Sequence, residues 1–192
     1  MKKTVLSTLL LALSVLAVPA QAADYDIDTK GAHAFIQFKI NHLGFSWLIG
    51  RFNKFDGQFS YDPKNPQAST ITVNIDPASI DSNHAERDKH LRSKDFLDVS
   101  KFPTAKFVST SYKAKGKDKA IVKGKLTLHG VTRTISINVK HVGEGKDPWG
   151  GYRAGFEGST TLTLKDFGID YNLGPASRTV EMFLSIEGIR RK

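Results

Sequence analysis

The segment from Ser82 to Ser100 carries the side chains best suited to bind a metal ion. His84 and Asp88 are four residues apart, and so are Glu86 and His90. Residues at this spacing share one face of a helix, where an imidazole and a carboxylate can bind zinc or iron together. The two pairs lie on different faces, however, and do not converge on one ion. A charged helix surface explains the segment equally well, so we predict no metal site.

Other catalytic chemistry has little support in this sequence. The chain contains no cysteine, which excludes thiol nucleophiles, cysteine-ligated zinc sites and iron–sulfur clusters. It also lacks a GxSxG elbow, a phosphate-binding loop and a dinucleotide fingerprint. No spacing distinguishes a serine–histidine–aspartate triad or a pair of glycosidase carboxylates. We therefore expect a protein that is not an enzyme, has no catalytic residues and needs no cofactor.

His42 is the histidine with the most informative position. It continues an apolar face made by every second residue of the preceding segment, namely Ala34, Ile36, Phe38 and Ile40. Two interpretations remain open: a core histidine bonded to the backbone, or a polar group at a cavity mouth that meets the head of an apolar ligand. Trp47 poses a similar question, because its ring supplies apolar bulk while its indole N–H needs a partner.

These side chains must be positioned by β-strands. Residues 41–61 hold six aromatic residues and three glycines, too apolar for a surface loop and unfavourable for a helix. We predict two strands here, joined by a glycine-containing turn, with Phe55, Phe59 and Tyr61 on one side.

Alternation of apolar and polar residues predicts the remaining strands. Their signatures are Ile71-Val73-Ile75, residues 107–112, Val122 to Leu128, Ile135 to Val139, residues 152–164, and Val180 to Ile186. The pair His129-Gly130 between two of these runs predicts a hairpin with a two-residue turn.

One stretch breaks the alternation and predicts a short helical insertion around residues 83–99. Asn83 can cap a helix, and Glu86 completes a capping box with it. A second short turn is expected over Lys94 to Val99, and Phe102-Pro103 ends the insertion.

About eight antiparallel strands in one domain, residues 23–192, permit a sandwich or a barrel. Small residues at inward positions, Ala34, Gly124 and Gly158, would leave space inside and so favour a barrel with an open lumen. The alternative is that the same glycines merely mark bends in the strands. The loops 147–151 and 174–177 are expected at its rim. The inward faces predict these ligand-contacting residues: Ala34, Ile36, Phe38, Ile40, His42, Trp47, Phe55, Phe59, Ile71, Val73, Leu126, Leu128, Ile135, Ile137, Phe156, Leu162, Met182 and Leu184.

The N-terminus predicts export. Two lysines precede an uncharged run, and Ala20-Gln21-Ala22 then forms a small-residue cleavage site. This pattern is typical of a secretory signal peptide over residues 1–22, cleaved between Ala22 and Ala23. The alternative, a membrane anchor, needs a longer apolar run of roughly 18 residues. We expect a soluble protein in a bacterial periplasm.

The chain carries a net charge of +9, and its lysines concentrate between Lys113 and Lys125. These lysines could attract anionic lipid headgroups. A solvated hairpin whose edge lysines prevent aggregation is the preferred interpretation. No nucleic-acid partner is expected, since the aromatic residues do not interleave with the basic ones.

Five segments in order carry a family resemblance: HLGFSWLIGRF (42–52), SNHAERDKHLRSKDFLD (82–98), GKLTLHGVTR (124–133), DPWGGYRAGFEG (147–158) and LKDFGIDYNLGPAS (164–177). Together they resemble the YceI-like family of secreted proteins across essentially the whole mature chain. The resemblance implies an extended lipocalin-like barrel of eight antiparallel strands with a helical insertion. It also implies a long isoprenoid chain, such as a quinone or its precursor, or a similar amphiphile in the lumen.

The predicted function is therefore a periplasmic carrier of an amphiphilic lipid, with a stress- or pH-related role left open. One alternative is an enzyme acting on the bound lipid, with His42 as acid or base. Another is a membrane-surface stress protein that uses the lysine-rich hairpin. Transient membrane contact and a homodimer are both compatible with the exposed strand edges.

Overall fold

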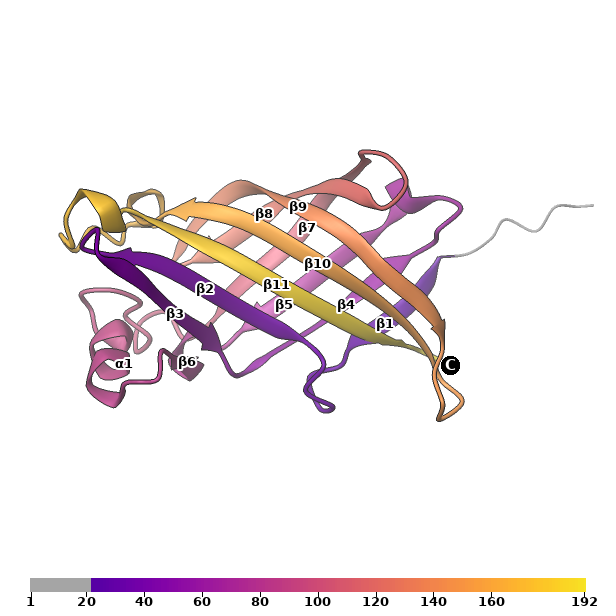
Figure 1. Cartoon of the computed structure of the whole chain (residues 1–192), viewed down its shortest axis with the longest axis horizontal. Helices are drawn as coiled ribbons and strands as arrows, with labels where there is room; N and C mark the ends of the chain where they lie inside the picture. The colour runs from indigo at the N-terminus through magenta and orange to yellow at the C-terminus, as the bar shows by residue number, and fades with distance from the viewer. Residues whose placement is uncertain (1–21) are drawn as a thin grey trace, which may run out of the picture.

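The computed structural model describes residues 22–192, which form one antiparallel β-sheet with a short helical insertion (Figure 1). Residues 1–21, which hold most of the predicted signal peptide, lie outside the described part. The strands are β1 (Ala23–Ile27), β2 (Phe35–His42), β3 (Ser46–Phe52), β4 (Phe55–Tyr61), β5 (Thr70–Ile75), β6 (Ile80–Asp81), β7 (Ala105–Ala114), β8 (Lys119–Leu128), β9 (Val131–Lys146), β10 (Tyr152–Thr163) and β11 (Thr179–Arg190). The only α-helix within residues 22–192 is α1 (Ala85–Arg92), and 3₁₀ turns occupy Pro66–Ala68, Pro77–Ser79, Leu164–Phe167 and Pro175–Ser177. No helix in this range is long and apolar enough to cross a bilayer.

Eight strands close into the barrel that the sequence predicts. Their order is β1-β4-β5-β7-β8-β9-β10-β11, and β1 pairs with β11 to complete the ring. The register of this closing pair runs from Tyr25 opposite Arg190 to Ile27 opposite Gly188.

The remaining strands form a branch that sequence reasoning did not foresee. β2 pairs with the first half of β11, from Val180 to Ser185, and β3 and β6 follow outward from β2. The two strands predicted within residues 41–61 are thus β3 and β4, but they do not form a hairpin. β3 pairs with β2 and β6, whereas β4 pairs with β1 and β5. The glycine-containing turn lies one connection earlier, between β2 and β3.

The predicted hairpin at His129-Gly130 is confirmed. β8 and β9 pair from Leu128 opposite Val131 onward, leaving two residues in the loop. Both have positive φ, 50° at His129 and 72° at Gly130, which is the type I′ geometry that matches strand twist.

The helical insertion is shorter than predicted, and its cap differs. The N-cap is His84, whose Nδ1 accepts the backbone N–H of Arg87 at 3.2 Å, while Asn83 has φ of 61° and lies outside the helix. The second short turn expected over Lys94 to Val99 is present, as turns at residues 94–97 and 99–100. The prediction followed the usual preference for Asn at the cap, but an imidazole one residue later supplies the acceptor.

Aromatic rings fill the space beside several strand glycines. A Cβ added at Gly124 would overlap the ring of Phe107, and one at Gly188 would overlap the ring of Phe59. Phe107 lies on β7, which pairs with β8, whereas Phe59 lies on β4, one strand beyond the β1 that pairs with β11. Each glycine therefore leaves room for a ring from another strand, which explains its place in a strand interior.

This packing corrects the prediction that Ala34 and Gly124 leave open space in the lumen. Phe107 covers Gly124, and Ala34 is buried in a packed cluster. Gly158 does border open space inside the barrel, beside Leu184, whose nearest methyl would lie 3.1 Å from a Cβ at this glycine.

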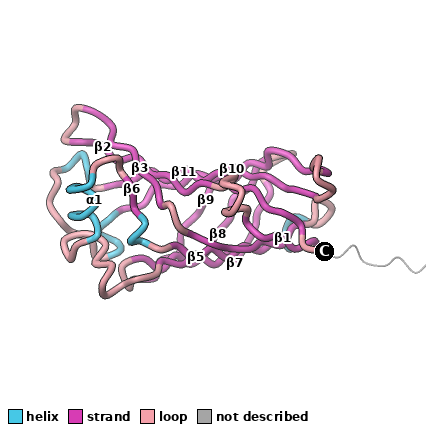
Figure 2. Tube along the Cα trace, turned by 90° about the horizontal axis from the view of Figure 1, so that it is seen from below, coloured by secondary structure: helices cyan, strands magenta, loops and turns pink. Residues whose placement is uncertain are grey.

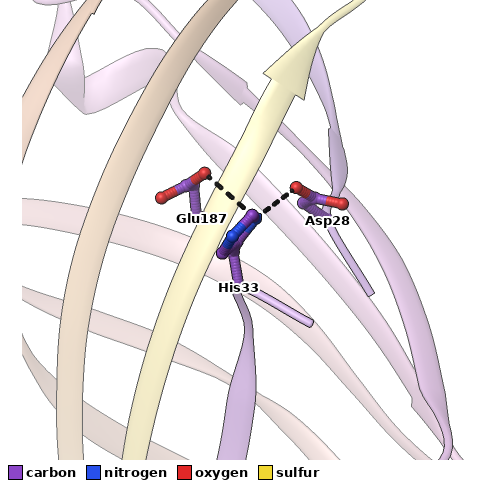
Figure 3. Close-up of side chains that lie close together, drawn as sticks. All are labelled: Asp28, His33 and Glu187. Atoms are coloured by element: carbon purple, nitrogen blue, oxygen red, sulfur yellow. Dashed lines mark hydrogen bonds and ion pairs between the residues drawn. The ribbon is translucent and has the colours of Figure 1, made fainter. Parts of the chain in front are cut away.

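A network of ion pairs fastens two loops to the outer wall of the barrel (Figure 3). Arg153 on β10 donates to Asp28 at 2.7 Å, to Asp147 at 2.9 Å and to Glu187 at 2.6 Å, and His33 Nδ1 lies 2.9 Å from Asp28. Burial opposes ionisation of Asp28, but its bonds to His33, Arg153 and the Gly31 N–H prevail and hold its pKa at about 2.

We expect Gly124→Ala to destabilise the protein by about 1–3 kcal/mol, because the new methyl must displace the Phe107 ring. The measurement is the free energy of unfolding in urea. Gly143→Ala is the matched control, since a Cβ there meets no atom within 4 Å. Equal effects of the two substitutions would contradict this account of strand glycines.

We expect acid to remove the contribution of Asp28 to stability. Its pKa is about 2 in the folded state against an ordinary 3.8, so its stabilising effect is present above pH 3.8 and is lost as the pH falls towards 2. Asp28→Asn should lower the melting temperature at neutral pH and flatten its dependence between those two values. Asp170→Asn, at an exposed carboxylate paired with Lys165 at 3.6 Å, is the control and should leave the curve unchanged.

Candidate functional site

The interior of the barrel holds a cavity made of two adjoining chambers. The narrower one has a volume of about 150 Å³ and the wider one about 400 Å³. Their walls meet at a constriction whose side chains line both chambers: Ile75, Leu126, Leu162 and Met182. Because these four come from β5, β8, β10 and β11, the constriction spans the barrel.

The narrower chamber lies among the central strands and is bounded by aromatic rings. Tyr61 packs edge-on against Phe156 at 5.1 Å between ring centroids, and Phe59 does so at 5.5 Å. Burial raises the pKa of Tyr61 to about 12, and nearby Tyr112 adds to the shift. Burial also raises the pKa of Tyr112. The phenols therefore stay neutral, and the chamber presents no charge from them.

The wider chamber lies between the β2–β3 branch and the helical insertion. Phe38, Ile40 and Leu48 supply one side of its wall, and Leu91, Phe96 and Leu97 supply another. Their positions follow from the topology: where β2 replaces β1 beside β11, the branch diverges from the barrel, and the insertion covers the resulting space. α1 and the β2–β3 turn accordingly lie at the same end of the molecule (Figure 1).

Polar groups gather on the wall of the wider chamber: Asn41, His42, Arg87, His90 and Ser177. Most are held by neighbours. Arg87 donates from Nε to Ser82 Oγ at 2.8 Å and from Nη2 to the Ser82 carbonyl at 2.6 Å, and His90 Nε2 lies 3.1 Å from Asp95. The Ser177 hydroxyl donates to the Asn41 carbonyl at 2.6 Å. The chamber thus combines an apolar interior with a fixed set of donors.

The structure places most of the predicted ligand-contacting residues on the walls of the two chambers. The narrower chamber is lined by Ile36, Phe59, Ile71, Val73, Ile135, Ile137, Phe156 and Leu184, the wider one by Phe38, Ile40, His42 and Leu128, and both by Leu126, Leu162 and Met182. Alternation along each strand was sufficient to identify them, since every second residue faces inward.

Three predicted residues lie away from the cavity. Trp47 points outward, because its neighbour Leu48 takes the inward position on β3, and the indole is half exposed with Lys39 Nζ 4.4 Å from its ring. Ala34 and Phe55 belong to the packed cluster beside the narrower chamber, but neither side chain lines either chamber. Alternation along a strand predicts which side chains face inward, but it does not show whether the barrel interior beside them is packed or open.

The structure contradicts the first of the two interpretations of His42, and contact with a ligand headgroup stays a prediction. His42 is exposed and lines the wider chamber, so it is a polar group at the mouth and not a core histidine. Within residues 22–192 its ring forms no hydrogen bond to another side chain, whereas general acid–base catalysis needs a positioned partner.

Of the two predicted rim loops, residues 174–177 supply Ser177 to the wider chamber. Residues 147–151 instead bind Arg153 through Asp147.

Sequence reasoning missed the contribution of the helical insertion. Arg87, His90 and Leu91 of α1 line the wider chamber, as do Phe96 and Leu97. The available signal was the pair Phe96-Leu97 in an otherwise charged segment, since two adjacent apolar residues there need a covered surface.

No metal centre emerges from the helix residues that opened the sequence analysis. His84 caps α1, Asp88 is buried and accepts from the Ser82 N–H at 2.9 Å, and His90 faces Asp95. Asp28, His33 and Glu187 do place ligand atoms within 4.8 Å of one another. However, one nitrogen of Arg153 already binds both carboxylates, and its positive charge disfavours a cation at that point.

Comparisons with known proteins agree with this architecture. The chain is 60% identical over 191 residues to a UPF0312 protein of Ectopseudomonas mendocina and 57% identical over 192 residues to one of Azotobacter vinelandii, each covering 100% of both chains. Among solved structures it resembles Burkholderia cenocepacia BcnA (TM-score 0.74, 23% identity, 84% of this chain and 98% of that chain). It also resembles a polyisoprenoid-binding domain from Saccharophagus degradans (TM-score 0.65, 17% identity, 87% and 98%).

The profile of the YceI-like domain matches residues 25–188, from Tyr25 of β1 to Gly188 of β11. This match and the full-length relatives at 60% identity together establish the family. The chain belongs to the YceI-like domain family.

Proposed function

We propose that this protein binds the long chain of an isoprenoid lipid, or of a similar amphiphile, in the two-chamber cavity and carries it through water. The observation that carries the proposal is a cavity with an apolar interior and a cluster of polar groups at its wider end. An amphiphile has the same asymmetry, a long apolar tail and a polar head. The resemblance of the fold to a domain described as polyisoprenoid-binding supports this choice of ligand.

The energetics favour such a ligand. The wider chamber alone lies within the roughly 300–1,000 Å³ typical of ligand pockets. Burial contributes about 0.8 kcal/mol per CH₂ group, so several isoprene units gain more than about 10 kcal/mol before the cost of ordering the chain. The tail can extend past Met182 into the narrower chamber, while the head stays near His42 and Arg87.

We further propose that the protein binds its lipid without chemical turnover and needs no cofactor. The polar groups of the wider chamber support this view, since Arg87 and His90 are already engaged with Ser82 and Asp95. Such groups suit recognition of a headgroup more than proton transfer.

We assign the site of action to the periplasm. The support is the secretory pattern of residues 1–22, with cleavage between Ala22 and Ala23. β1 begins at Ala23, so this cleavage would leave the barrel strands intact.

We expect the protein purified from its own host to contain one prenyl lipid per chain. Organic extraction followed by mass spectrometry measures it, and heat-denatured extracts of an unrelated periplasmic protein serve as background. Repeatedly empty extracts, together with no uptake of added octaprenyl compounds, would reject the proposed function.

We expect Phe38→Asp to weaken lipid binding at least tenfold, because it places a charge on the wall of the wider chamber. Lys117→Glu, on the exposed β7–β8 connection, is the control and should bind as the unmodified protein does. The measurement is the affinity for a fluorescent prenyl analogue, with circular dichroism to verify folding. Equal losses would indicate surface binding instead.

Met182→Trp provides a second variant should Phe38→Asp fail to fold. The indole fills the constriction without adding charge, so long chains should bind more weakly while short ones that fit the wider chamber are retained. Unchanged selectivity for chain length would show that the tail does not cross the constriction.

A further inference from the structure

The turn between β2 and β3 exposes more apolar surface than any neighbouring connection needs. Phe45 is 87% exposed, Ile49 62%, Leu43 54% and Trp47 52%. We refer to residues 42–49 as the β2–β3 tip. Four large exposed apolar residues thus lie within seven positions, a concentration that soluble proteins usually reserve for an interaction.

The backbone holds this tip in a fixed shape. Leu43 has φ of 55° and Gly44 has φ of 86°, and the Gly44 N–H donates to Asn41 Oδ1 at 2.6 Å. The Phe45 N–H closes the turn on the His42 carbonyl at 2.9 Å. The first position of such a turn favours Asn, Asp or Gly, so a leucine there is costly for the backbone and for solvation. A costly residue on a rigid turn points to a function for its side chain.

The tip also forms part of the cavity mouth. His42 and Leu43 line the wider chamber, and the side chain of Tyr171, which is 48% exposed, packs on His90 and Phe96 at the same chamber. Figure 2 shows the β2–β3 turn standing out from the body beside α1. Whatever covers the tip therefore also faces the opening.

Exposed basic side chains lie near the tip. Lys39 lies over the Trp47 ring and pairs with Glu181 at 3.1 Å, and Lys89 and Lys94 are exposed on the helical insertion, where Glu86 is exposed as well. Tryptophan and phenylalanine beside basic residues are typical of segments that lie in the interface of a bilayer.

We propose that the β2–β3 tip inserts into the surface of an anionic lipid bilayer and places the cavity mouth against the membrane. The tail of a lipid can then pass from the bilayer into the wider chamber without crossing water. The passage of a lipid tail into the cavity rests on the proposed function, whereas the docking of the tip on a bilayer does not.

Vesicle flotation tests the docking with the purified full protein. The vesicles contain phosphatidylcholine alone or with phosphatidylglycerol, and no isoprenoid. We expect binding to the anionic vesicles, a blue shift of Trp47 fluorescence in a Trp149→Phe background, and at least fivefold weaker binding of Phe45→Ser. Trp149→Ser is the matched control, because Trp149 is 77% exposed at the β9–β10 connection and should be dispensable.

Three outcomes would overturn the docking: no binding to anionic vesicles, an equal loss in Phe45→Ser and Trp149→Ser, or a dimer that Phe45→Ser dissociates. Loading of a prenyl lipid into the cavity is measured separately from docking. Phe45→Ser should load a prenyl lipid from detergent as the unmodified protein does but at least fivefold more slowly from vesicles. Phe38→Asp should dock normally and fail to load, so docking and carriage can fail independently.

Discussion

The structure depends on the divided edge of β11. A strand can pair with only one neighbour at each position of its edge, and β11 gives residues 180–185 to β2 and residues 188–190 to β1. The pairing with β1 closes an eight-stranded ring, whereas the pairing with β2 directs a second set of strands away from it. The wider chamber lies where these two sets diverge. A barrel closed by β1 along its full length would have an interior filled largely by its own side chains.

This division explains why the helical insertion belongs to the site. The space between the branch and the barrel must be covered, and the insertion does so with Leu91, Phe96 and Leu97 inward. Its polar residues are held by hydrogen bonds to Ser82: Arg87 donates to the serine hydroxyl, and Asp88 accepts from the serine N–H. The segment that resembles a metal-binding helix in sequence is thus a lid whose charges hold its own fold.

Much of the barrel could be predicted from alternation, and the residues at its two ends could not. Phe38, Leu126 and Ile137 are correctly identified as inward because each strand has period two, and His129-Gly130 identifies its hairpin because the turn chemistry is local. Trp47 and Phe55 were placed wrongly because their surroundings depend on which distant strand lies beside them. The family resemblance supplied the barrel topology, but it did not indicate that Phe107 fills the space beside Gly124.

The end of the barrel opposite α1 holds the buried side chains of Tyr25, Ile27 and Ala154, which line neither chamber. The exposed side chains of His42 and Leu43 line the wider chamber, which marks that chamber as the entrance for a lipid bound in the proposed way. Under that proposal, release by the same entrance would be the reverse of loading. The direction of net lipid transport would then be set by the relative affinities of the donor and the acceptor for the lipid, because loading and release use the same entrance.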